Sequence, residues 1–123
     1  MVRFVSLLKR REGMSYEDFK NYYQSTHSQR RKTLPDIPKT KCVKTERRFM
    51  VETAHPIDDA TAGTEAPRYD VILEKWYETL EDIQDDMKIL GREDVWPIYL
   101  EDENQLFDRR YSVCYIVEEI VDK

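Results

Sequence analysis

A β-strand is predicted at residues 2–9, which read Val-Arg-Phe-Val-Ser-Leu-Leu-Lys. The run is rich in β-branched, aromatic and aliphatic side chains, and it stops at a turn around Gly13. Ser15, with Asp18 three residues later, then supplies a capping signal for a helix. The chain is therefore expected to begin with a strand, a turn and a helix.

The first helix is predicted from about Ser15 to Lys32, and two prolines follow it. Phe19, Tyr23 and His27 are spaced four residues apart, so they lie on one face of this helix. Because that face is apolar and aromatic, we expect it to pack on a sheet, with His27 pointing toward the same sheet.

The rest of the chain repeats the pattern of strand and helix. The predicted elements are an exposed strand at 40–52, a polar loop at 53–68, a strand at 69–77, a helix at 80–90, a helical turn at 93–99, an acidic connection at 101–110 and a final strand at 111–121. The order β-α-β-β-α-β is typical of the ferredoxin-like fold, an α+β architecture with a four-stranded antiparallel sheet. With 123 residues, we expect one domain over residues 1–123.

Both faces of the predicted sheet carry apolar side chains. The strand at 2–9 shows this most clearly, with Val5 and Leu7 on one parity and Phe4 and Leu8 on the other. Helices on one face leave the second face to be covered, and a face open to water would be polar. We therefore predict a homodimer in which two sheets pack together, with a cavity between sheet and helices.

Charge is unevenly distributed along the chain, whose net charge is −5. Residues 1–48 carry 13 Lys and Arg against 5 Asp and Glu, whereas residues 49–123 carry 7 against 20. This asymmetry fits a nucleic-acid patch, an anionic ligand site, or one half of the chain packing against the other. We rank nucleic-acid binding last, because the chain is acidic overall and has no RNA-binding motif.

Several kinds of site are disfavoured by the residues present. No apolar run approaches the roughly 20 residues of a membrane helix, and no signal peptide is evident, so we expect a cytoplasmic protein that does not bind membranes. Cys42 and Cys114 fit neither a disulfide framework nor a metal site. Nucleotide, hydrolase and zinc motifs are absent from the sequence, and we predict no metal and no cofactor.

His27 is the first candidate for chemistry. A histidine at the edge of an apolar pocket can have a pKa near neutrality and act as a general acid or base. The alternative is a packed histidine with one satisfied hydrogen bond. Asp70 begins an apolar strand, where a carboxylate needs a partner. It is expected either to orient His27 and share the acid role, or to cap the strand end.

Four further residues are candidate substrate contacts: Tyr23, Trp76, Tyr115 and Arg30. Tyrosine combines an apolar ring with a hydroxyl, which suits flat, oxygenated ligands, and Arg30 can hold a carboxylate or phosphate. The aromatic residues could equally belong to the core or the dimer interface, and Arg30 could be a solvated cation at a helix end.

The chain is similar to the EthD family along nearly its whole length. The resemblance is carried by residues 2–15, Glu17, Asp18, Phe19, Tyr22, Tyr23, His27, Tyr69, Asp70, Glu74, Trp76, Tyr77, residues 80–82, Asp102, Glu103, Phe107 and Asp108. It implies a dimeric α/β barrel. It also implies that the histidine at position 27 transfers protons.

Relatives of that family include methylmuconolactone isomerases, tetracenomycin-type cyclases and fungal anthraquinone-pathway decarboxylases. The resemblance thus implies a cofactor-independent lyase or isomerase acting on a small oxygenated cyclic, aromatic or polyketide-derived compound. The reaction would be a decarboxylation, a dehydrative cyclisation or a lactone isomerisation. The alternative is a barrel that binds haem or another small ligand without transforming it, with His27 as an axial ligand.

Overall fold

The computed structural model describes residues 1–34, 36–51 and 68–117. The element order is β1 (Val2–Leu8), α1 (Tyr16–Ser25), a 3-10 helix η1 (His27–Thr33), β2 (Lys44–Phe49), β3 (Val71–Tyr77), α2 (Leu80–Leu90), α3 (Trp96–Leu106) and β4 (Val113–Val117). The predicted loop at 53–68 lies almost wholly outside the described residues, as do positions 118–121 of the last predicted strand.

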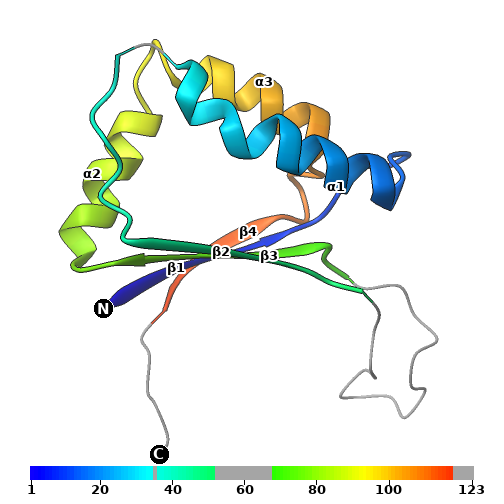
Figure 1. Cartoon of the computed structure of the whole chain (residues 1–123), viewed down its shortest axis with the longest axis horizontal. Coiled ribbons are helices and arrows are strands. Elements are labelled where there is room, and N and C mark those ends of the chain that lie inside the picture. Colours follow the sequence, from blue (N-terminus) through cyan, green and yellow to red (C-terminus); the bar gives the residue numbers. More distant parts are fainter. Residues whose placement is uncertain (35, 52–67, 118–123) are drawn as a thin grey trace, which may run out of the picture.

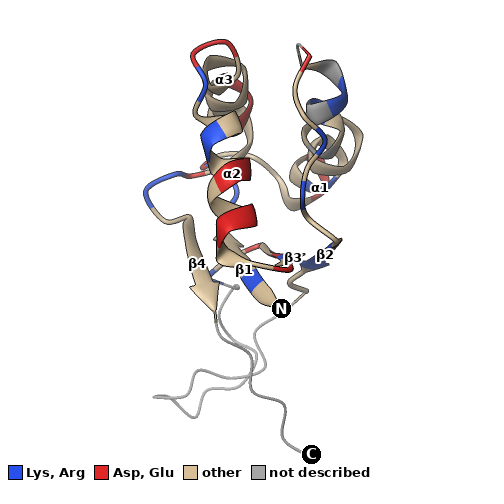
Figure 2. Cartoon of the chain, turned by 90° about the vertical axis from the view of Figure 1, so that its left-hand side faces the viewer, with Lys and Arg blue, Asp and Glu red and all other residues tan. Residues whose placement is uncertain are grey.

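The four strands form one antiparallel sheet in the order β2-β3-β1-β4. All three α-helices stand on the same side of this sheet, and no described helix covers the other side (Figures 1 and 2). This is the predicted α+β, ferredoxin-like arrangement. It gives the sheet a helix-covered face and an open face. Along each strand, the side chains of successive residues point alternately to one face and the other.

The strand register assigns side chains to these two faces. Val5 pairs with Glu74 on β3 and with Tyr115 on β4, so these three residues share the open face. Ser6 pairs with Leu73 and with Cys114 in the next row, which belongs to the helix-covered face. The open face therefore carries both apolar and charged side chains.

Both predicted capping signals are present in the structure. The Ser15 hydroxyl accepts a hydrogen bond from the Asp18 backbone N–H at 3.1 Å, and Thr79 does the same for Asp82 at 3.1 Å. Each hydroxyl satisfies one of the backbone donors left unpaired in a first helical turn. These caps fix where α1 and α2 leave the sheet.

The core lies between α1 and the strands beneath it. Phe19, Tyr23 and Val71 are fully buried there, together with Leu106 at the end of α3. The Phe19 and Tyr23 rings meet edge to face at 6.0 Å, and both also contact the ring of Phe107. The stripe predicted at positions 19 and 23 is therefore the core-facing side of α1.

Two predicted elements differ from the structure. The expected helix at 15–32 ends as an α-helix at Ser25 and continues as η1, with Thr26 between them. The acidic connection expected at 101–110 is wrong over its first half, because α3 extends through residues 96–106. Partners on α1 and η1 stabilise the buried acidic side chain of Asp102 on this helix, and no local pattern in the sequence reveals those partners.

No helix within the described ranges is both long enough and apolar enough to cross a membrane.

Candidate functional site

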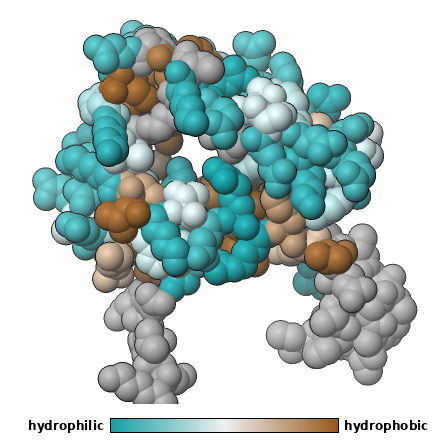
Figure 3. Space-filling model, viewed as in Figure 1, coloured by the Kyte–Doolittle hydropathy of each residue, from teal (hydrophilic) through white to brown (hydrophobic). Residues whose placement is uncertain are grey.

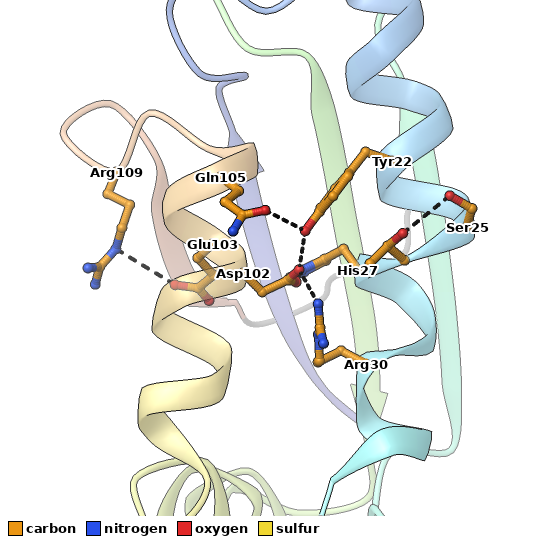
Figure 4. A network of polar contacts seen from close by, with 9 residues as sticks. Tyr22, Ser25, His27, Arg30, Asp102, Glu103, Gln105 and Arg109 are labelled. Carbon is orange, nitrogen blue, oxygen red and sulfur yellow. Dashed lines mark hydrogen bonds and ion pairs between the residues drawn. The ribbon is translucent and has the colours of Figure 1, made fainter.

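A buried carboxylate on α3 joins three side chains from the first helical segment. Asp102 binds Nδ1 of His27 through one oxygen, and accepts hydrogen bonds from the Tyr22 hydroxyl at 2.7 Å and from Arg30 at 2.8 Å through the other. Gln105 also contacts the Tyr22 hydroxyl, at 3.2 Å. Figure 4 shows Tyr22 from α1, and His27 and Arg30 from η1, converging on Asp102.

Burial and hydrogen bonding fix the charges of the pair. Burial alone would raise the pKa of Asp102, but the hydrogen bonds from Tyr22, Arg30 and His27 outweigh it and hold this pKa below its ordinary value. Burial is also the main influence on His27, and it lowers the pKa of the imidazole even though Asp102 acts in the opposite direction. The arrangement is thus a carboxylate beside a neutral imidazole.

A neutral imidazole beside a carboxylate must carry its proton on the nitrogen that faces the carboxylate. Nδ1 of His27 is therefore the donor to Asp102, and Nε2 holds the lone pair. The His27 side chain is 14% exposed, while that of Asp102 is 1% exposed. The imidazole is held in one tautomer and still reaches accessible space.

Aromatic rings fix the imidazole from its other sides. The His27 ring meets Tyr23 edge to face at 5.1 Å and Phe107 at 5.2 Å. Its position follows from the end of α1, where the Thr26 N–H bonds back to the Tyr22 carbonyl and η1 begins at the next residue. These contacts place the His27 ring beside Tyr23, on the core-facing side of α1.

A pocket of about 730 Å³ lies between the sheet and the helices, and an opening between these layers is visible in Figure 3. Its walls include His27 together with aromatic rings, aliphatic side chains and both cysteines. The aromatic lining residues are Phe4, Tyr23, Trp96, Tyr99 and Phe107. This volume and aromatic character suit a flat organic molecule.

Charged side chains line the same pocket. Arg47 and Lys75 come from the sheet, and Glu103 and Arg109 from α3 and the segment after it. Glu103 Oε2 lies 3.7 Å from Nε of Arg109, and the two point away from the Asp102 network (Figure 4). Burial raises the pKa of Glu103, and Arg109 opposes that rise only in part.

Two of the predicted site residues line the pocket and one supports it. His27 and Tyr23 are both in its wall. Burial raises the pKa of Tyr23 to about 12, so its phenol stays protonated near neutral pH. Arg30 contacts Asp102, at 2.8 Å, and so belongs to the support of His27.

The other three predicted residues lie elsewhere. Asp70 is buried, but its carboxylate accepts the Arg10 backbone N–H at 2.8 Å and lies 3.7 Å from the Lys9 ammonium, so the carboxylate beside His27 is Asp102. Its contacts match the strand-end alternative. Trp76 and Tyr115 are on the open face by strand register, and neither lines the pocket.

Sequence reasoning missed the two acidic residues that matter here. Asp102 and Glu103 belong to the resemblance to the EthD family, but the local pattern predicts that their segment is a connection. A helical pattern over residues 96–106, with Trp96, Tyr99, Glu103 and Leu106 on neighbouring turns, points to Glu103 but not to Asp102.

Among the residues that the structure describes, no group of three His, Cys, Asp or Glu side chains is arranged to hold a metal ion.

Comparison with known proteins gives a family match. Residues 11–109 match the model of the EthD domain. This range begins ahead of α1 and ends after α3, so it contains His27, Asp102 and most of the pocket wall. No curated protein matches the chain.

Solved structures share the fold at low sequence identity. An EthD family protein of Bacillus halodurans is 15% identical, with a TM-score of 0.60 over 98% of this chain and 99% of its own. A protein of Arabidopsis thaliana is 12% identical, with a TM-score of 0.61 over 100% and 99%. A dimeric protein of unknown function and ferredoxin-like fold from Bacteroides fragilis is 12% identical, with a TM-score of 0.53 over 96% and 95%.

Proposed function

The chain belongs to the EthD family, and we propose that it is a cofactor-independent lyase or isomerase in which His27 transfers protons on a small oxygenated cyclic compound. The observation that supports this most directly is the pairing of a neutral imidazole with a buried carboxylate, at the wall of an aromatic pocket. A positioned base of this kind contributes roughly 10²- to 10⁴-fold to a proton transfer.

Nε2 of His27 is the atom that would act on the substrate. Its lone pair takes a proton from an acidic C–H or O–H group, and the resulting imidazolium is stabilised by Asp102 through Nδ1. The imidazolium then returns the proton to another position on the substrate, or to a carbanion left by loss of a group. Decarboxylation, dehydrative cyclisation and lactone isomerisation share this exchange of one proton.

Tyr23 and Glu103 can each stabilise the negative charge that such a transfer creates on the substrate, by donating a hydrogen bond or a proton. The Tyr23 phenol is protonated near neutral pH and lies beside His27, so it can donate a hydrogen bond to an enolate or phenolate oxygen. The raised pKa of Glu103 makes this carboxyl group a better proton donor than an exposed glutamate. Both residues line the pocket.

We also propose that the protein is a homodimer closed through the open faces of two sheets. Val5, Leu7 and Ile72 place apolar side chains on that face, and Tyr115 is 52% exposed there. The Bacteroides fragilis protein with the same fold is dimeric. The cytoplasmic location expected from the sequence stays a prediction.

The experiment that tests the proposal is turnover by His27→Gln on the true substrate, with substrate binding measured in parallel. We expect turnover to fall about 10²- to 10⁴-fold while binding is retained. Unchanged turnover would remove His27 from the mechanism. Binding without any turnover in the wild type would instead favour the alternative, a barrel that holds a small ligand or haem without transforming it.

A further inference from the structure

We propose that the pocket takes a flat cyclic carboxylate, and that the carboxylate group binds to Arg47 and Lys75 on the sheet. The inference deepens the proposed function, since it names the substrate class of the same pocket. It does not depend on catalysis by His27, because it concerns binding alone.

The two cations occupy neighbouring strands on the helix-covered face. Arg47 on β2 pairs in register with Leu73 on β3, and Lys75 lies two residues further along β3, opposite Thr45. Side chains in such diagonal positions have Cα atoms roughly 7–8 Å apart and are within reach of one small group. All four of these residues line the pocket.

Arg47 differs from the cations on the open face of the same strand. Arg48 is ion-paired with both Glu46 and Glu74, and Lys44 lies 2.9 Å from Glu46. The guanidinium of Arg47 instead lies over the Tyr23 ring at 5.6 Å. Within the described part of the chain, no carboxylate is within ion-pair distance of Arg47, so a ligand's carboxylate would not have to displace one.

The charges lining the pocket are predominantly positive, although the chain is acidic. Arg47, Lys75 and Arg109 face a single lining acid among the described residues, Glu103, which is already next to Arg109. With His27 neutral, the described residues of the lining carry a formal charge of +2, from three cations and one carboxylate. The chain as a whole carries −5. Attraction of an anion would thus be a property of this pocket and not of the protein's overall charge.

The cations also face the proton-transfer residue. After burial, which is the largest cause, Lys75 and Arg47 both act to lower the pKa of His27. A carboxylate bound between them would offset their charge at the imidazole. The wall beside His27 is aromatic and includes Tyr23 and Phe107. The ring of such a ligand would pack against these side chains while its carboxylate reaches the cations on the sheet.

The test compares two flat probes of equal shape, 2-naphthoate and 2-naphthamide, by isothermal titration calorimetry at pH 7.5 on the full chain. We expect the carboxylate to bind about tenfold tighter or more, equivalent to about 1.4 kcal/mol. Arg47→Gln and Lys75→Gln should each reduce this preference several-fold. The matched controls are Arg48→Gln and Lys44→Gln, on the open face of β2, and they should keep it.

Two further variants separate charge from folding and binding from catalysis. Arg47→Lys should retain most of the preference, because it keeps the positive charge in the pocket. His27→Gln should bind 2-naphthoate with its preference intact even if its turnover is abolished. Equal affinity for the two probes, no binding of 2-naphthoate, or an equal loss in the Arg48→Gln control would overturn the proposed carboxylate site, and none of these results would bear on His27.

Discussion

His27 and Asp102 lie 75 positions apart in the chain and meet through a direct contact between Nδ1 and a carboxylate oxygen. The contact joins η1 to α3 above the sheet, and it places a neutral imidazole beside a side chain that is 1% exposed. Because Asp102 also binds Tyr22 and Arg30, one carboxylate orders three side chains on the first helical segment. It thus has both a structural and a positioning role.

Replacing Asp102 separates these two roles. Asp102→Asn leaves donors at Tyr22 and Arg30 facing a neutral amide, so we expect the free energy of unfolding in urea to fall by about 1–3 kcal/mol. The folded pKa of Asp102 is below 3.8, so the wild type's advantage is complete above that pH and is lost as the pH falls further. Asp94→Asn, which breaks an exposed pair with Arg92, is the control and should lower the free energy of unfolding much less than Asp102→Asn does.

The positioning role predicts non-additive kinetics. If Asp102 acts only by orienting His27, Asp102→Asn should lower turnover, but the double variant with His27→Gln should be no slower than His27→Gln alone. The measurement is kcat/KM for the two single variants and the double variant. Independent, multiplying losses would show that Asp102 does not act through His27.

The protonation of His27 can be followed without a substrate. Burial lowers the pKa of His27 from its ordinary value of 6.5, so we expect its ring signal in proton NMR to titrate below pH 6.5. The chain has 2 histidines, so His27→Gln identifies the signal by its loss. Lys75→Gln and Arg47→Gln should each move the midpoint upward, because both cations oppose protonation. A midpoint at or above 6.5 in the wild type contradicts a desolvated imidazole.

The sequence was sufficient for the parts of the fold that depend on local pattern. Ser15 and Thr79 cap their helices as predicted, and the spacing of Phe19 and Tyr23 indicates the buried side of α1. Alternation along the strands also placed Val5 and Leu7 opposite in face to Phe4 and Leu8. These features depend on contacts within a few residues or on a fixed period of two or near four.

The partner of His27 was not predictable in the same way. Asp70 was a reasonable candidate because it is an acid beside an apolar strand, and it is indeed buried, but its partners are Lys9 and Arg10. Asp102 is in a run of charged residues that reads as an exposed connection, and its burial follows only from the packing of α3 against α1 and η1. For Trp76 and Tyr115, the strands that carry them were predicted. The strand register, however, places both side chains on the open face and not in the pocket.

Glu103 offers a test on stability at different pH values. Burial raises its folded pKa above 4.5, so its contribution to stability is complete below pH 4.5 and is lost as the pH rises through the folded pKa. Glu103→Gln should therefore gain stability relative to the wild type between pH 4 and pH 7, by about 1 kcal/mol or less because the side chain is partly accessible to water. The control is Glu101→Gln, at an exposed position, which should show no such trend in thermal unfolding.

The open face of the sheet gives the last prediction. Tyr115 lies on β4 opposite Val5 and is 52% exposed, whereas Tyr111 is 60% exposed but precedes the strand. In a dimer closed through this face, Tyr115→Lys would bury a charge in each subunit, since a two-fold interface repeats every substitution. We expect the dissociation constant to rise roughly 100-fold or more, an effect of the size seen at interface hot spots.

Light scattering during gel filtration should then show a monomer for Tyr115→Lys and a dimer for both the wild type and the matched Tyr111→Lys variant. A wild type that remains monomeric at high concentration would contradict this assembly, whereas loss of the dimer in Tyr111→Lys alone would place the interface elsewhere.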